Sequence, residues 1–207
     1  AIFGEAQSDR IDEQHPCKPT NPYGSSKLAV EMMLADAARA YGLRATSLRY
    51  FNAAGADPSG KIGESHLPET HLIPKLLRRA AGEIIDVEIY GNNYPTRDGT
   101  CIRDYIHVCD LADAHLLAME YSRTHPGFHC FNLGNGAGYS VLEVIAAAEK
   151  VVGRKLDIPQ GPRRAGDPPI LVASSKHARE VLRWQPRFTR IEQIVADAWR
   201  WHQQPAY

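Results

Sequence analysis

Tyr23 and Lys27 stand four positions apart in the stretch NPYGSSK. A free tyrosine has a pKa of about 10, so a tyrosine that removes a proton at neutral pH needs its phenolate stabilised. Asn21 suits a helix N-cap and Pro22 the first helical position, so we expect both residues on the first turns of a helix. There the Lys27 ammonium can approach the phenol or a shared cofactor ribose, and the helix dipole adds positive potential. The pair alone is a weak signal, because most such tyrosines merely pack at a helix surface.

A second group of residues could hold phosphate. Arg103 lies in CIRDY, and Arg164 and Asp167 lie in PRRAGD. A guanidinium group can donate two parallel hydrogen bonds to the oxygens of a diphosphate, and it does so better than an ammonium group. Without further context, solvated surface arginines and a salt-bridged turn are the simpler interpretation.

The elements that must position these residues alternate between helix and strand. A helix is expected from Pro22 until Gly42 stops it, followed by a strand over Arg44–Phe51 and a loop rich in glycine, proline and aspartate. Two capping boxes are expected to open later helices, Ser140 with Glu143 and Thr189 with Glu192. This alternation predicts an α/β fold.

The composition excludes several classes of protein. The 24 basic and 24 acidic residues give zero net charge and are spread along the chain, so neither nucleic acid nor an anionic membrane is an expected partner. No apolar run reaches the roughly 20 residues of a membrane span, and the N-terminus lacks a signal-peptide pattern, so a cytoplasmic protein is expected. The four cysteines show no metal or disulfide spacing, and the nine histidines are scattered, so we expect free thiols and no metal site.

Five stretches together identify a family resemblance. NPYGSSKLAVE, LRYFNAAGADPSGKIGE, ETHLIPKLL, YGNNYPTRDGTCIRDYIHVCDLADAH and NLGNGAGYSVLEV resemble the UDP-glucose 4-epimerases, which are extended short-chain dehydrogenases/reductases. The resemblance covers essentially the whole chain. It implies part of a Rossmann-like parallel sheet with a smaller C-terminal α/β domain that binds the UDP-sugar substrate. It also implies tightly held NAD, which accepts hydride from C4 of the sugar and returns it to the other face of a 4-keto intermediate, interconverting UDP-galactose and UDP-glucose.

The resemblance assigns roles to individual residues. Tyr23 would be the base, and Lys27 would be its activator and a ligand of the cofactor ribose. Phe51 would lie beside the cofactor, and Arg103 and Arg164 would bind the diphosphate. The remaining substrate positions implied in this way are Asn52, His71, Leu72, Glu88, Ile89, Tyr90 and the ribose-binding Asp167.

One departure from the family pattern concerns the cofactor. No G-x-x-G-x-x-G stretch, which would cradle the NAD pyrophosphate, occurs in the 207 residues. We therefore expect the C-terminal portion of an epimerase that begins within a central strand at Ala1, lacks the N-terminal NAD-binding half and is inactive by itself. Residues 1–52 would complete the Rossmann-like domain. Residues 53–207 would mainly bind substrate, with about 101–135 returning to the Rossmann-like domain.

A second departure concerns the sugar. Family members that exclude N-acetylated sugars carry a tyrosine four residues after the ribose-binding aspartate, where this chain has Leu171. We therefore expect the full-length enzyme to accept UDP-N-acetylglucosamine as well as UDP-glucose. The family resemblance also implies a homodimer, which the Pro22–Tyr41 helix could join in a four-helix arrangement.

Other functions stay open. A nucleotide-sugar 4,6-dehydratase is disfavoured because Ala1 stands where that enzyme has a glutamate. A UDP-glucuronate 4-epimerase or a related nucleotide-sugar enzyme is the second enzymatic interpretation. A naturally truncated, non-catalytic nucleotide-sugar-binding module is the alternative from another class.

Overall fold

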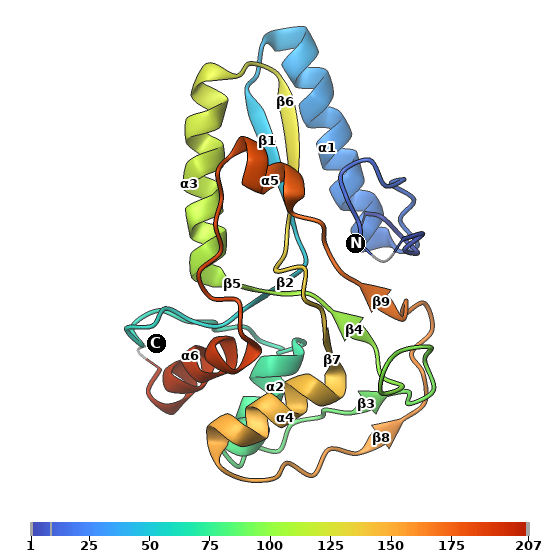
Figure 1. Ribbon diagram of the computed structural model, residues 1–207, viewed down its shortest axis with the longest axis vertical. Helices are drawn as coiled ribbons and strands as arrows, with labels where there is room; N and C mark the ends of the chain where they lie inside the picture. The colour runs from blue at the N-terminus through green and yellow to red at the C-terminus, as the bar shows by residue number, and fades with distance from the viewer. Residues whose placement is uncertain (1, 9, 206–207) are drawn as a thin grey trace.

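The computed structural model describes residues 2–8 and 10–205. Its longest ladder joins β1 (Ala45–Tyr50) to β6 (Phe128–Leu133) in parallel. Helices α1 (Pro22–Tyr41) and α3 (Val108–Thr124) run along the two sides of this strand pair, and α5 (Lys176–Val181) lies beside it (Figure 1). Since parallel neighbours need a crossover connection, usually through a helix, this half of the molecule has the α/β architecture that the alternation predicts.

The other half consists of helices and short strands (Figure 1). The buried residues Leu76, Val144 and Ile194 join its three helices in one core. These helices are α2 (Leu72–Ala80), α4 (Val141–Val152) and α6 (Ile191–Gln203). The strands are β2 (Asn52–Ala54) parallel to β5 (Tyr105–His107), β3 (Ile89–Tyr90) parallel to β8 (Gln160–Gly161), and β4 (Ile102–Arg103) between antiparallel β7 (Tyr139–Ser140) and parallel β9 (Ile170–Leu171).

Local signals account for the helix that carries the candidate base. The Asn21 side chain accepts the N–H of Gly24 at 2.8 Å and caps α1, and Pro22 occupies its first turn. Gly42 ends the helix with φ of 68°, a left-handed conformation that suits glycine. The predicted start and end of this helix are therefore confirmed, as is the capping box of Ser140 and Glu143 on α4.

One predicted helix cap was wrong. Thr189 does not cap α6, because the helix begins after Arg190 and has no side-chain cap, while the Thr189 carbonyl accepts the hydroxyl of Tyr139 at 3.1 Å. The first residue of α6, Ile191, is already buried in the core with Ile194 and Val195. The expected start within a strand at Ala1 lies outside the described residues, and the residues that follow, Ile2 and Phe3, form a buried turn.

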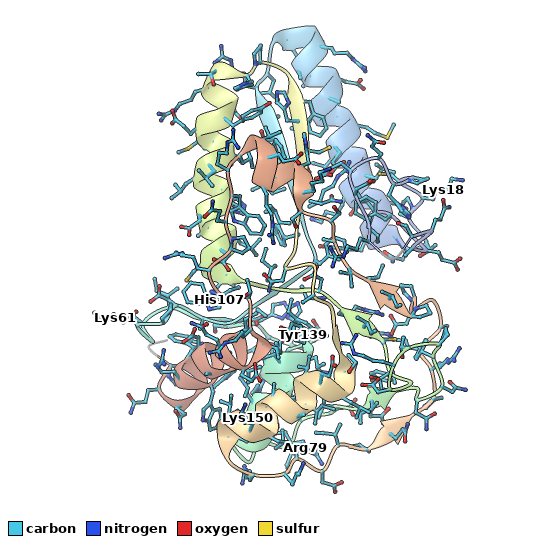
Figure 2. The ribbon with its side chains drawn as sticks, in the orientation of Figure 1. Lys18, Lys61, Arg79, His107, Tyr139 and Lys150 are labelled. Carbon is cyan, nitrogen blue, oxygen red and sulfur yellow. The ribbon has the colours of Figure 1, made fainter. Side chains whose placement is uncertain are left out.

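Charged side chains are distributed over the surface. Lys18 and Lys61 project from opposite sides of the molecule (Figure 2). His107, by contrast, is buried where β5 runs into α3, between the two halves (Figure 2). Within residues 2–8 and 10–205, no helix has the length and apolarity that a bilayer crossing requires.

Candidate active site

A cavity of about 590 Å³ opens where α1 begins and β1 ends. Residues from distant parts of the sequence meet in its wall. The predicted site residues among them are Tyr23, Lys27, Phe51, Asn52, Arg103, Asp167 and Leu171. The fold thus gathers the candidate acid–base pair and much of the candidate phosphate site into one space.

The Tyr23–Lys27 pair has the arrangement that its spacing predicts. Tyr23 is 64% exposed, and the Nζ of Lys27 lies 5.2 Å from the centroid of its ring. The Ser26 hydroxyl donates to the Tyr23 carbonyl at 2.7 Å within the same first turns of α1. The Lys27 ammonium therefore lies over the ring of an accessible tyrosine, and a nearby positive charge favours the ionised form of a phenol.

A buried ion pair holds this helix against the sheet. Arg49 of β1 donates to Glu31 of α1 through Nε at 2.9 Å and through Nη2 at 2.6 Å, and Ser47 donates at 2.7 Å. Burial raises the pKa of Glu31, but the hydrogen bonds from Arg49 and Ser47 outweigh it, and the pKa is lowered overall. Sequence reasoning did not single out either partner, because a glutamate and an arginine 18 positions apart show no local signal.

Two aromatic side chains also line the cavity. The rings of Phe3 and Phe51 stack with centroids 6.3 Å apart, and both line the cavity with Tyr23 and Lys27. A flat ring can lie against these side chains while Lys27 contacts an attached ribose or phosphate. The cavity can therefore hold the ring and ribose of a nucleotide-like cofactor.

Asp167 lies between the two candidate phosphate-binding arginines. Its Oδ1 is 3.6 Å from Nη2 of Arg103, and it accepts two hydrogen bonds from Arg164, at 3.0 and 3.1 Å. The hydrogen bond to Asp167 raises the pKa of Arg164 above its ordinary value. Two guanidinium groups against one carboxylate leave an excess positive charge, which suits an anionic ligand.

Six predicted positions lie outside the wall of this cavity. Ile89 and Tyr90 form β3, next to Glu88, and Arg164 stands over the ring of Tyr90 at 5.4 Å. Arg164 thereby connects that group to Asp167 at the cavity. His71 precedes α2, which begins at Leu72, and its ring faces Glu64 and Glu69.

A carboxylate that sequence reasoning missed lies directly after Arg103 and joins that segment to two other loops. Asp104 is fully buried and accepts the backbone N–H groups of Asn135, Gly136 and Ala173. Burial raises its pKa, against the opposing effect of these three donors. Its position directly after Arg103 in a strand-like RDY stretch was the only available sequence signal.

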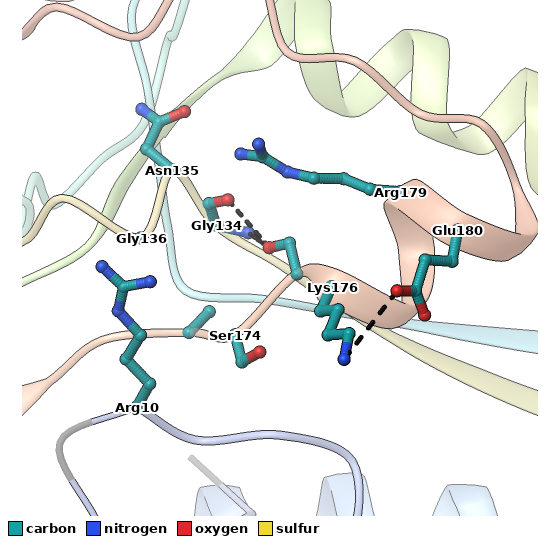
Figure 3. Close-up of a pocket in the computed structure, with 10 residues that line it drawn as sticks. Arg10, Gly134, Asn135, Gly136, Ser174, Lys176, Arg179 and Glu180 are labelled. Carbon is teal, nitrogen blue, oxygen red and sulfur yellow. Dashed lines mark hydrogen bonds and ion pairs between the residues drawn. The ribbon is translucent and has the colours of Figure 1, made fainter.

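A second cavity, of about 370 Å³, contains none of the predicted site residues. Arg10 and Arg179 reach it from different segments, and Lys176 pairs with Glu180 at 3.9 Å (Figure 3). It offers cationic groups but no acid–base pair comparable to Tyr23 and Lys27. The first cavity is therefore the candidate active site.

The chain is similar in sequence to a known protein family and to individual members of it. The model of the NAD dependent epimerase/dehydratase family matches residues 1–134. The chain is 51% identical to the UDP-glucose 4-epimerase of Lacticaseibacillus casei over 203 residues, 98% of this chain and 61% of that protein. The chain thus spans about three fifths of the length of this curated relative.

Solved structures share the fold over nearly the whole chain. A crystal structure of a UDP-glucose 4-epimerase superposes with a TM-score of 0.94 at 48% sequence identity. The superposed region covers 99% of this chain and 63% of the chain in that crystal structure. The Bifidobacterium longum UDP-glucose 4-epimerase, in complex with NAD+ and UDP, superposes with a TM-score of 0.92 at 38% identity, over 99% of this chain and 61% of its own. The predicted Rossmann-like α/β class is confirmed.

Proposed function

The chain belongs to the NAD dependent epimerase/dehydratase family, and from this we propose that the full-length protein is an NAD-dependent UDP-glucose 4-epimerase that interconverts UDP-galactose and UDP-glucose. The observation that carries the proposal is the meeting of Tyr23 and Lys27 with Arg103 and Asp167 in one cavity. An acid–base pair beside a diphosphate-binding pair is what a reaction on the sugar of a nucleotide-sugar needs.

In this proposal Tyr23 moves the proton. Its phenolate oxygen removes the proton of the sugar 4-hydroxyl and later returns it, and the Lys27 ammonium stabilises the charged form. When bound, NAD supplies the reversible hydride acceptor for C4 of the sugar. Arg103 and Arg164 hold the diphosphate, so that the sugar can present either face to the cofactor while its nucleotide stays bound.

The residues present fit one end of NAD. Lys27 and Tyr23 would contact the nicotinamide ribose, and Phe51 would lie beside the ring, since all three line the cavity. No G-x-x-G-x-x-G stretch for the pyrophosphate occurs in the 207 residues. We therefore propose that these residues alone do not turn over substrate, and that residues 1–52 and about 101–135 belong with the cofactor-binding domain.

We assign the other end of the cavity to the UDP-sugar. Asn52 and Leu171 would face the sugar and Asp167 the ribose, while Tyr90 with its neighbours would hold the uracil outside the cavity wall. Arg164 supports this assignment, because it contacts both Tyr90 and Asp167. Exposed apolar side chains on α1, Met32 and Met33 at 61% and 62%, support the proposed homodimer.

The experiment compares two tyrosines on one helix in the full-length protein. Tyr23→Phe removes only the hydroxyl, and we expect kcat for UDP-galactose to fall by about 100-fold or more with a much smaller change in KM. Tyr41→Phe is the matched control, since Tyr41 is 86% exposed at the far end of α1. Equal activity of the two variants would exclude Tyr23 as the base. No conversion of UDP-galactose by the wild-type enzyme would exclude the proposed reaction.

A further inference from the structure

Four side chains with metal-binding donor atoms meet in the segment that leads into α2. They are Glu64, His66, Glu69 and His71, and one donor atom of each lies within 4.8 Å of the others. None of the four lines the cavity that contains Tyr23. We infer that this cluster is a binding site for one divalent transition-metal ion, of which Zn²⁺ is the best match.

The charge balance of the cluster points to a cation. The Nδ1 of His71 lies 2.9 Å from an oxygen of Glu64 and 2.9 Å from an oxygen of Glu69. An imidazole nitrogen carries at most one proton, so it cannot donate a well-aligned hydrogen bond to both carboxylates. A divalent ion would compensate both charges at once.

The backbone around the cluster is held in place before any ion binds. The side chain of Glu69 is only 4% exposed, and its Oε1 accepts the N–H groups of Thr70 and His71, each at 2.7 Å. The indole of Trp201 on α6 donates to the Glu64 carbonyl at 2.9 Å. A Cβ atom at Gly63 would lie 2.2 Å from the same indole, so the backbone runs directly against it. Hydrogen bonds that orient ligands in this way raise metal affinity.

The donor set selects the kind of metal. Two imidazoles with two carboxylates suit Zn²⁺ and related transition metals, whereas Ca²⁺ and Mg²⁺ prefer oxygen ligands alone. A tetrahedral zinc ion with ligands at about 2.0–2.2 Å holds them roughly 3.3–3.6 Å apart, so donor atoms that lie within 4.8 Å of one another must close by at most about 1.5 Å. His66 can move by this amount because its side chain is 49% exposed.

Four protein ligands leave no open coordination position, so the metal would be structural. It would join residues 64–71 to the start of α2, while Trp201 and Glu64 attach the same segment to α6. The segment that joins β2 to α2 passes beside α6 (Figure 1). The sequence expectation of no metal site rested on scattered histidines, and the spacing E-x-H-x-x-E-x-H matches no common zinc motif. The inference does not depend on the proposed epimerase activity. His71 is also one of the substrate positions that the family resemblance implies, but none of the four ligands lines the cavity around Tyr23.

Calorimetry on the full chain tests the site. The protein is treated with a chelator, dialysed and titrated with Zn²⁺, alongside Glu64→Gln and His66→Gln. The control is the double variant His125→Gln/His129→Gln, which removes another neighbouring histidine pair, with ring centroids 6.5 Å apart. We expect one Zn²⁺ per chain in the wild type and the control, and binding weaker by roughly 100-fold in each ligand variant. Co²⁺ bound at the site should give the intense visible bands of tetrahedral coordination.

The inference is overturned if the wild type binds no stoichiometric Zn²⁺, or if both ligand variants bind it as the wild type does. If only the His125→Gln/His129→Gln variant loses Zn²⁺ binding, the metal binds at that histidine pair. This result would also overturn the inference. The metal-free melting temperature of each variant shows whether it folds. Since the side chain of His66 is half exposed, His66→Gln keeps the test valid if Glu64→Gln is unstable.

Discussion

The buried carboxylate of Asp104 accepts the backbone N–H of Ala173 at 3.1 Å. This hydrogen bond ties the residue after Arg103 to the chain that continues from Leu171. The same carboxylate also accepts the N–H groups of Asn135 at 2.9 Å and Gly136 at 3.0 Å. One side chain therefore joins the chain just after β4 to the chain just after β9, the two strands that carry Arg103 and Leu171 of the cavity wall.

Removing this carboxylate should destabilise the protein. Asp104→Ala would leave three backbone donors without their acceptor, and each buried unsatisfied donor costs about 1–3 kcal/mol. We expect the free energy of unfolding to fall by roughly 3 kcal/mol or more, measured by urea denaturation. Asp86→Ala, at an exposed position, should change it by less than about 0.5 kcal/mol. Equal stability of the two variants would show that water replaces the carboxylate at these donors.

The Glu31–Arg49 pair should make stability depend on pH. Both side chains are 11% exposed. Glu31→Gln leaves Arg49 buried without its counter-charge, so we expect a loss of about 3 kcal/mol at neutral pH. The folded-state pKa of Glu31 is below its ordinary value of 4.5, so its charged form stabilises the protein above that pH. This contribution disappears as the pH falls through the lowered pKa.

Urea denaturation of the wild type and Glu31→Gln across this acidic range measures the effect. The difference between them should shrink as the pH falls. Asp36→Asn is the control, because Asp36 pairs with Arg39 on the same helix but both are well exposed. A difference that stays constant from neutral to acidic pH would contradict an ionic contribution.

Leu171 should influence which sugars the full-length enzyme accepts. Its side chain lines the candidate active site, and a tyrosine there would occupy more of the space near an N-acetyl group. For Leu171→Tyr we expect kcat/KM for UDP-N-acetylglucosamine to fall by about 10-fold or more, which is about 1.4 kcal/mol, with little change for UDP-glucose. An unchanged preference between the two sugars would remove Leu171 from the specificity determinants.

Arg103 should contribute to UDP affinity through its forked guanidinium. Arg103→Lys keeps the charge and loses the two-point geometry, so we expect the Kd for UDP, measured by calorimetry on the full-length protein, to rise by about 10-fold. Arg39→Lys on the exposed side of α1 is the matched substitution and should leave the Kd unchanged. If Arg103→Lys binds UDP as tightly as the wild type does, the diphosphate does not bind at Arg103.

Local features of the fold could be predicted because they depend on a few neighbouring residues. The start of α1 follows from Asn21 and Pro22, its end from Gly42, and the placing of Lys27 beside Tyr23 from helical spacing. The predicted cap at Thr189 failed, because the apolar face of α6 packs against α2 and α4 and sets where the helix begins. Where packing competes with a capping signal, the larger buried area decides.

The sequence by itself determined the family, the α/β class, and the residues whose chemistry suits proton transfer and diphosphate binding. Only the tertiary structure decided which of those residues share a cavity, and it revealed three arrangements: the Glu31–Arg49 pair, the three donors on Asp104, and the cluster of Glu64, His66, Glu69 and His71. The physical reason is that such arrangements depend on burial and on distances across packed elements. A carboxylate has the same letter in the sequence whether it is solvated or buried against three N–H groups.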